Sequence, residues 1–131
     1  MRIIVSVAFI VLAFMSSYAQ SSEADKKGAE IKFLEKSKDF GDIIQGDSIS
    51  YTFKFNNTGT DTLKIFNVVT TCSCTSRKYT DTPIAPGKSG EVIVSFNSKD
   101  KEGRQNKVIT VLSNAINNPE RVLLICNVLK K

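Results

Sequence analysis

The segment Ser48–Asn56 alternates between large apolar and polar side chains along its whole length. Its apolar positions are Ile49, Tyr51, Phe53 and Phe55. Successive side chains of a β-strand point to opposite faces, so this period predicts a strand with one face in a core and one face in water. A strand of this kind is stable only when neighbouring strands pair with it and cover its apolar face. The segment therefore favours a fold built from β-sheets.

Other segments repeat this pattern at short intervals, separated by residues that are typical of turns. Further strands are expected to begin at Ile31–Phe33 and to cover residues 91–96, 107–112 and 121–129. Residues 57–61 tolerate positive φ and precede the apolar stretch 63–69, which predicts a hairpin between residues 48–56 and that stretch. No window has a sustained helical period. The spacing predicts an all-β, immunoglobulin-like sandwich of about seven antiparallel strands over residues 31–131.

The start of the chain has the pattern of an export signal. Arg2 precedes an apolar run that ends at Met15, and Ser17–Ala19 supplies the small residues that a signal peptidase reads. We therefore expect a signal peptide over residues 1–19, cleaved before Gln20.

The apolar run of this signal is not expected to remain as a membrane anchor. The apolar run is shorter than the ~20 residues that span a bilayer, and polar sequence follows it at once. The first cysteine is Cys72, far from the predicted cleavage point, so lipidation through cysteine is not expected. Residues 20–30 are expected to form a flexible leader. The sequence thus predicts an exported protein, periplasmic or extracellular, that is not a lipoprotein and keeps no stable membrane span after cleavage.

Composition excludes several classes of site. The chain has no His, and its two methionines, Met1 and Met15, lie in the predicted signal. This excludes His-based catalytic triads, His metal sites and thioether copper sites in the exported part. The net charge is +5, but the basic residues are dispersed and are not interleaved with aromatic rings, so nucleic acid is not an expected partner. We expect no catalytic residues, no metal site and no cofactor.

Several short motifs follow one another along the chain after about Ala29. They are Asp39–Ile43, Gly46–Asp47, Phe55–Gly59, Leu63–Ile65, Cys72–Thr75, Ile84–Gly87 and Ser113–Asn114. This ordered set resembles a large secreted bacterial family labelled domain of unknown function fifteen-seventy-three, which is related to hydin-type (ASH) and sperm-protein-type immunoglobulin-like domains. The resemblance implies an immunoglobulin-like fold and an envelope location. The family usually has glycine between the two cysteines, where this chain has Ser73.

The three cysteines are the most chemically suggestive feature. Cys72 and Cys74 are two residues apart, so on an extended segment both thiols point to one side, while Cys126 shares the apolar face of the last predicted strand. Cys126 could form a disulfide with Cys72 or Cys74. The pair Cys72 and Cys74 could instead carry out disulfide exchange, or bind Cu(I) with Cys126 or a carboxylate completing the shell. The remaining interpretation is that the thiols pack as small hydrophobic groups.

The leading functional hypothesis is a non-catalytic module that binds an envelope protein or glycan through a sheet edge or the loops at one end. Arg77, Lys78 and Tyr79 are expected on a surface loop and are the candidate binding residues, since Tyr and Arg often anchor interfaces. The alternative is a thiol-dependent envelope protein acting through Cys72 and Cys74. A hydrolase is disfavoured, because no motif sets a lysine or carboxylate beside a nucleophile.

Overall fold

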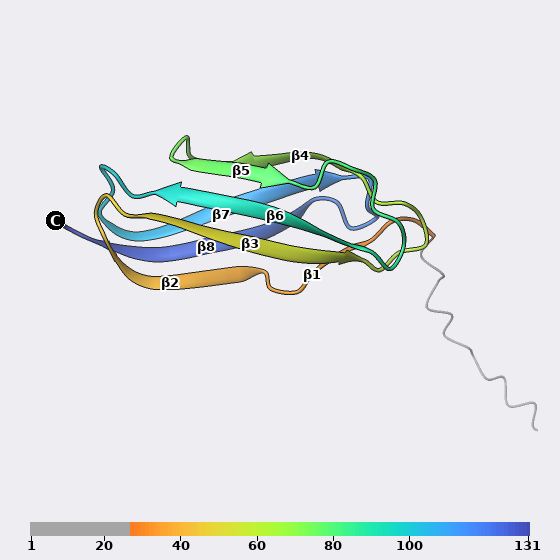
Figure 1. The fold of residues 1–131 in the computed structure, drawn as a ribbon, viewed down its shortest axis with the longest axis horizontal. Helices are drawn as coiled ribbons and strands as arrows, with labels where there is room; N and C mark the ends of the chain where they lie inside the picture. The colour runs from red at the N-terminus through yellow and green to blue at the C-terminus, as the bar shows by residue number, and fades with distance from the viewer. Residues whose placement is uncertain (1–26) are drawn as a thin grey trace, which may run out of the picture.

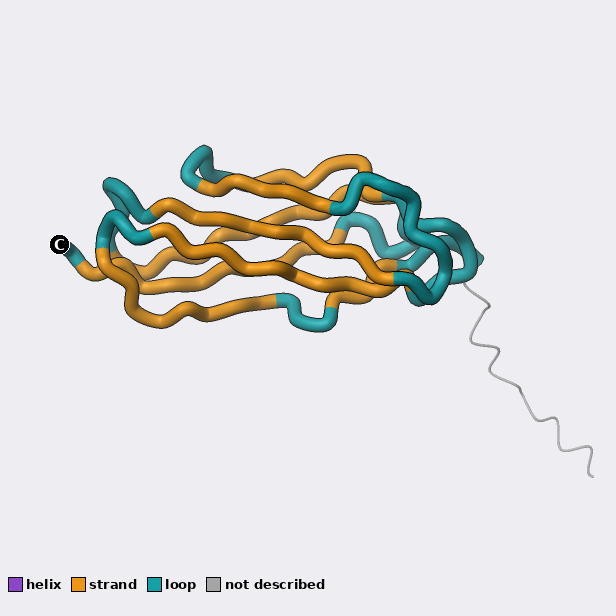
Figure 2. The backbone as a smooth tube through the Cα atoms, in the orientation of Figure 1, coloured by secondary structure: helices purple, strands orange, loops and turns teal. Residues whose placement is uncertain are grey.

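A computed structural model describes residues 27–131, which form eight β-strands in two stacked sheets and no helix (Figures 1 and 2). The strands are β1 (Ile31–Phe33), β2 (Ser37–Ile44), β3 (Ser48–Asn57), β4 (Ile65–Thr70), β5 (Thr75–Tyr79), β6 (Ser89–Asn97), β7 (Gly103–Ser113) and β8 (Glu120–Leu129). The prediction of an all-β sandwich is confirmed. The predicted signal peptide and most of the predicted leader lie outside the described residues. Within residues 27–131, no helix is long and apolar enough to cross a membrane.

The two sheets have four strands each. The first sheet has the order β1-β3-β6-β5 and the second has the order β2-β8-β7-β4. All neighbours are antiparallel except β2 and β8, which are parallel. The eight strands agree with the expected number of about seven, and the β2–β8 pair is the exception to the expected antiparallel arrangement. The chain leaves β1 in the first sheet and enters β2 in the second after three residues, so β2 meets β8 running in the same direction.

Alternate side chains fill the space between the sheets. On β3, Phe53 and Phe55 are fully buried and Tyr51 is half-buried, whereas Lys54 is exposed. The alternation predicted for this strand is confirmed. Phe96 on β6 is also fully buried. Burying large apolar side chains on both inner faces is the main source of stability for a sandwich of this size.

The predicted hairpin between β3 and residues 63–69 is wrong. β4 pairs with β7 in the second sheet, and Leu63 forms an isolated bridge with Ile84. Leu63 and Ile65 are both buried. The turn after β3 therefore carries the chain around a corner of the sandwich, and the apolar side chains enter the core from the opposite layer.

The folded part begins before Ile31. The backbone carbonyl of Gly28 accepts a hydrogen bond from Thr60 at 2.8 Å, and that of Ala29 accepts one from Ile116 at 2.8 Å. Ala29 is only 2% exposed. The last residues of the predicted leader are thus packed between two loops at one end of the sandwich.

β5 was expected as a surface loop and is a strand at the edge of the first sheet. It pairs with β6 from Thr75 to Tyr79. Thr75 is the one buried residue of β5. The other four residues are partly or fully exposed, and the strand contacts β4 beside it. An edge strand with four consecutive polar residues has no apolar alternation, which is why its sequence did not predict a strand.

Candidate functional site

The motif Phe55–Gly59 serves the fold. Asn57 is fully buried, and its side-chain Nδ2 donates to the carbonyl oxygens of Asp61 at 2.8 Å and Ile84 at 2.9 Å. Its Oδ1 accepts from the backbone N–H groups of Gly59 at 3.0 Å and Glu30 at 3.3 Å. Every polar group of this amide is thus satisfied inside the protein. The motif holds a turn to the N-terminal segment and leaves nothing for a ligand.

Other motif side chains close turns in the same way. Asp39 accepts from the N–H of Gly41 at 2.8 Å. The Asn114 side chain accepts from the N–H of Lys64 at 2.8 Å and donates to the carbonyl of Thr62 at 2.9 Å. These polar groups are occupied within the fold. The motif that begins at Cys72 is different, because it carries reactive sulfur close to the surface.

The loop from β4 to β5 contains a disulfide between Cys72 and Cys74, whose Cα atoms are 5.2 Å apart. Both cysteines are half-buried, and Ser73 between them is exposed. The N–H of Thr75 donates to the carbonyl of Cys72 at 3.1 Å, and the N–H of Asn97 donates to the carbonyl of Cys74 at 3.0 Å. The disulfide therefore sits in a tight turn that β6 anchors, at the start of β5.

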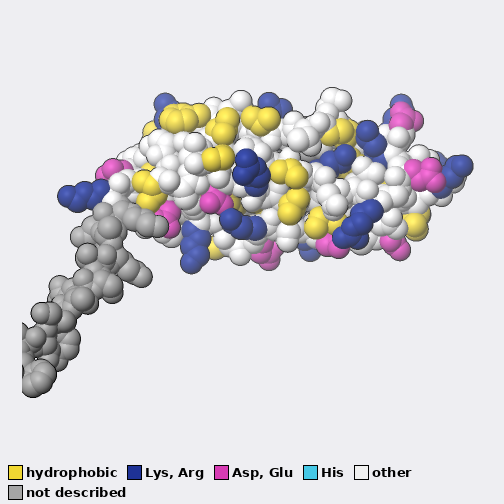
Figure 3. All heavy atoms as spheres, turned by 180° about the vertical axis from the view of Figure 1, so that it is seen from behind, with side chains coloured by type: hydrophobic (Ala, Val, Ile, Leu, Met, Phe, Trp, Pro, Cys, Tyr) yellow, Lys and Arg dark blue, Asp and Glu magenta, His cyan; other side chains and the backbone are white. Residues whose placement is uncertain are grey.

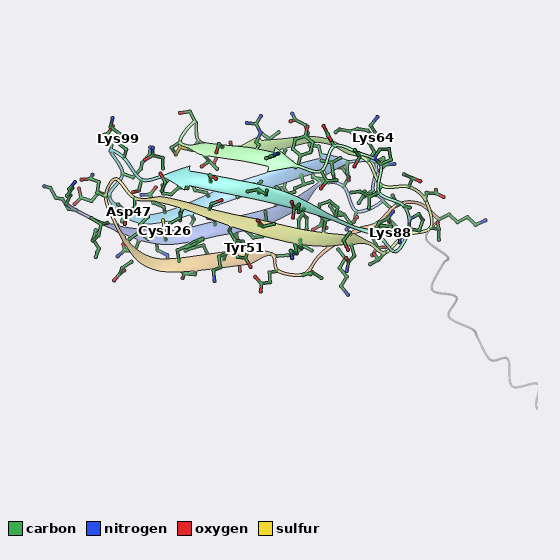
Figure 4. The ribbon with its side chains drawn as sticks, in the orientation of Figure 1. Asp47, Tyr51, Lys64, Lys88, Lys99 and Cys126 are labelled. Atoms are coloured by element: carbon green, nitrogen blue, oxygen red, sulfur yellow. A yellow bond between two sulfur atoms is a disulfide. The ribbon has the colours of Figure 1, made fainter. Side chains whose placement is uncertain are left out.

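Cys126 is not part of this bridge. It is free and 1% exposed on β8, between the two sheets (Figure 4). Burial raises the pKa of its thiol, the nearby Lys107 opposes this rise, and Asp39 adds to it. The predicted bridge from Cys126 to Cys72 or Cys74 is absent because β8 lies inside its sheet, between β2 and β7.

Residues 27–131 contain no group of three or more Cys, Asp or Glu side chains that could hold a metal ion. A Cu(I) site at Cys72 and Cys74 would also require their bond to be reduced, since thiolates are the copper ligands.

The three candidate binding residues lie on β5 and divide between its two faces. Arg77 donates through Nε to the carbonyl of Val68 on β4, and the Tyr79 hydroxyl donates to the carbonyl of Phe66 at 3.4 Å. These two side chains cover the edge of β4. Lys78 points to the opposite face of the strand and is exposed.

The backbone of β5 has an open side. The bonds from Asn97 to Cys74 and from the N–H of Thr80 to the carbonyl of Glu91, at 3.0 Å, show that even-numbered residues of this strand face β6. In an antiparallel pair the bonding residues alternate, so the N–H groups of Arg77 and Tyr79 point away from β6. Because β5 is the last strand of its sheet, these groups form a row along an edge. Such an edge can receive a further strand.

A shallow hollow of about 190 Å³ lies at the end of this strand. It is lined by Lys78, Tyr79, Thr80, Glu91 and Ile93. Pockets for drug-sized ligands have volumes of roughly 300–1,000 Å³. This hollow is smaller, so it suits one side chain of a docked polypeptide better than a small molecule.

The outer face of the second sheet is less suited to a single partner. Seen from behind, its hydrophobic side chains are interspersed with Lys, Arg, Asp and Glu (Figure 3). Val69 on β4 and Leu129 on β8 are exposed near opposite sides of this face. The corner formed by Cys72, Cys74 and β5 is therefore the better candidate site.

Solved structures share the fold at low sequence identity. A protein of unknown function from Porphyromonas gingivalis W83 superposes with a TM-score of 0.67 and 15% identity, covering 79% of this chain and 48% of that one. The ASH / PapD-like domain of human CEP192 gives a TM-score of 0.63 and 12% identity, covering 79% of this chain and 88% of that one. The secreted serine protease VesC from Vibrio cholerae gives a TM-score of 0.59 and 16% identity, covering 76% of this chain and 23% of that one.

These likenesses establish the fold and not an activity. This chain spans about half the length of the Porphyromonas protein and less than a quarter of the protease. No curated protein sequence matches it. The family model described as protein of unknown function (DUF1573) matches residues 31–128, which is most of the chain and the whole sandwich from β1 to the penultimate residue of β8. The chain therefore belongs to the DUF1573 family, and its immunoglobulin-like sandwich is related in fold to ASH and PapD-like domains.

Proposed function

We propose that this chain is an exported, non-catalytic module that binds an extended segment of an envelope protein along the open edge of β5. The observation that supports this most directly is the row of backbone groups on the edge, which includes the N–H groups of Arg77 and Tyr79. An incoming strand would pair with this row through main-chain hydrogen bonds. Its alternate side chains would supply specificity.

A polypeptide fits this edge better than a glycan does. The exposed backbone groups of β5 repeat with the period of a β-strand, and another strand presents donors and acceptors with the same spacing. The hollow beside Lys78 and Tyr79 has room for about one side chain. Lys78 and Glu91 line the hollow with opposite charges, so a polar side chain that can pair with either of them is favoured there.

The edges formed by β4 and β5 differ in a way that favours selective binding at β5. On β4, the carbonyls of Phe66 and Val68 are occupied by side chains from β5. On β5, the exposed charge of Lys78 disfavours pairing with an arbitrary strand, as charged residues on natural edge strands do. Of these two edges, that of β5 is the one left open to a partner whose charges suit it.

A proline on the outward-facing register tests the edge directly. Arg77→Pro removes a backbone N–H that points away from β6, so the β5–β6 hydrogen bonds stay intact. Arg77→Ala removes the same side chain and keeps that N–H. A photo-crosslinking residue at the exposed position 76 would report the partner in the native envelope. We expect the cross-linked product to persist in Arg77→Ala, at a reduced level, and to disappear in Arg77→Pro. An undiminished product in a folded Arg77→Pro protein would contradict edge binding.

A further inference from the structure

The Cys72–Cys74 disulfide contributes little to holding the fold together. It joins residues that are two apart in the sequence. The stabilisation that a cross-link provides grows with the length of chain that it closes, so this bridge is near the lower limit. The core around Phe53, Phe55 and Phe96 forms between the sheets without it. The sandwich can therefore lose and regain this bond while it stays folded.

The bridge is also partly exposed. Cys72 and Cys74 are both half-buried next to the exposed Ser73, and Cys74 also packs against the edge of the core, in the turn that precedes β5. The third cysteine, Cys126, is 1% exposed and cannot meet an incoming thiol in the folded protein. Only the bridge offers sulfur to solvent within the described part of the chain.

The two sulfur atoms differ in their surroundings. The backbone N–H of Cys74 donates to Sγ of Cys72 at 3.2 Å. A hydrogen bond from an N–H group favours the thiolate over the thiol, so it stabilises negative charge on Cys72 when the bond is broken. Sγ of Cys74 lies 3.9 Å from the hydroxyl of Thr75, a longer and weaker contact. Cys72 is therefore the better leaving group of the two.

We propose that the Cys72–Cys74 bridge is a redox site that accepts two electrons from cysteine thiols by thiol–disulfide exchange. A substrate thiolate attacks Sγ of Cys74, a new sulfur–sulfur bond forms there, and Cys72 leaves as a thiolate that the Cys74 N–H stabilises. This activity goes beyond binding at the edge of β5 and does not depend on it.

A second substrate thiolate completes the reaction. It attacks the substrate sulfur of the mixed disulfide, and Cys74 leaves as a thiolate. The two substrate thiols become one disulfide, and the two protons that they release balance those that Cys72 and Cys74 take up as thiols. The substrate is oxidised by two electrons and the protein bridge is reduced by two.

The first experiment measures electron transfer on the folded protein. The oxidised protein is mixed with reduced glutathione or with a peptide that carries one cysteine, quenched with an alkylating reagent and analysed by mass spectrometry. We expect Cys72 and Cys74 to become alkylated together while Cys126 stays unmodified, with the β-sheet circular dichroism unchanged. Reduction by glutathione alone would assign a small thiol as the donor, and faster reduction by the peptide would assign a protein thiol. A bridge that resists both thiols until the protein unfolds would overturn the proposal.

The second experiment tests the assigned roles. Cys74→Ala leaves Cys72 as a single accessible thiol and retains the N–H at position 74, while the matched Cys72→Ala leaves Cys74. At neutral pH we expect Cys72 to be alkylated about tenfold faster than Cys74, because a larger fraction of it is thiolate. The dependence of each rate on pH gives the two pKa values, and that of Cys72 should be lower. Equal values, or the reverse order, would overturn the assignment of Cys72 as the leaving group.

Discussion

The corner at Asn57 and the corner at Cys72–Tyr79 belong to the same sandwich and use their polar groups in opposite ways. At the first corner, the buried amide of Asn57 bonds to four backbone groups of its own chain. At the second, a half-buried disulfide is followed by a strand whose outer backbone groups face away from its sheet. Buried polar groups must be paired for the fold to be stable, whereas edge groups can be paired by water or by a partner. The motif around Asn57 is thus accounted for by folding, whereas the backbone groups left open on β5 are available to a binding partner.

The largest effect is expected from removing the amide of Asn57. Asn57→Ala would leave the N–H groups of Glu30 and Gly59 without their partner in a half-buried place and would remove one of the two hydrogen bonds to the carbonyl of Ile84, so we expect a loss of about 3 kcal/mol in the free energy of unfolding. Urea denaturation followed by circular dichroism measures this. Asn56→Ala is the matched control, since Asn56 is only half-buried and its side chain bonds to the exposed Ser89. Similar losses for the two variants would show that the amide network does not hold this corner.

Prolines on β5 should separate its two backbone registers. Lys78→Pro removes an N–H that faces β6 and should destabilise the protein by about 3 kcal/mol. Arg77→Pro removes an N–H on the open side together with one side-chain hydrogen bond, and should cost about 1 kcal/mol. Thermal unfolding of both variants gives the comparison. If Arg77→Pro were the more damaging, the edge assignment of β5 would be wrong.

Reduction of the disulfide should have a smaller effect on stability than Asn57→Ala or Lys78→Pro. For a loop this short, the chain-entropy model gives a contribution of about 1.5 kcal/mol. Urea denaturation with and without a dithiol reductant measures it, and the double variant Cys72→Ala with Cys74→Ala gives the sum of this contribution and the lost packing of the two sulfur atoms. A loss as large as that in Asn57→Ala would mean that the bridge is a structural support of the fold.

The alternation of apolar residues predicted the interior of this fold well. Ser48–Asn57 and Glu120–Leu129 are inner strands with one face against the core, and their side chains follow the two-residue period in the structure. This period is imposed by the core itself, so it is written into the sequence. The position of Cys126 on the buried face was predicted on the same basis.

The edges of the sandwich were predicted poorly for a related reason. β2 and β5 are edge strands with many polar or charged residues, and neither was expected as a strand. The pairing of Cys72 with Cys74 was likewise not decided by the sequence, because it depends on the turn between β4 and β5. Partner strands, turns and sheet order are long-range properties that local alternation does not encode. The candidate site lies in this less predictable part of the molecule.

The smallest effect concerns pH and the buried thiol of the inner strand β8. Burial raises the pKa of Cys126 above its usual value of 9.0. The folded state therefore holds its proton at pH values where the unfolded chain releases it. The contribution to stability is complete below the unfolded pKa and is lost as the pH rises through the raised folded pKa. Burial lowers the pKa of Lys107, and this makes the free energy of unfolding rise with pH. A stability profile of the wild-type protein alone would therefore combine the opposite effects of Cys126 and Lys107.

Comparing the wild-type protein with Cys126→Ala isolates the contribution of the Cys126 thiol to stability. The wild-type protein should be more stable than Cys126→Ala at neutral pH, by about 1 kcal/mol, because the shorter side chain leaves a small cavity. This difference should shrink between about pH 8 and about pH 10, where only the unfolded thiol ionises. The half-buried bridge at Cys72 and Cys74 has no thiol to ionise and contributes nothing to the change while it is oxidised. A difference that stays constant over this range would mean that Cys126 meets water in the folded protein, and that the contrast between the buried thiol and the accessible bridge is false.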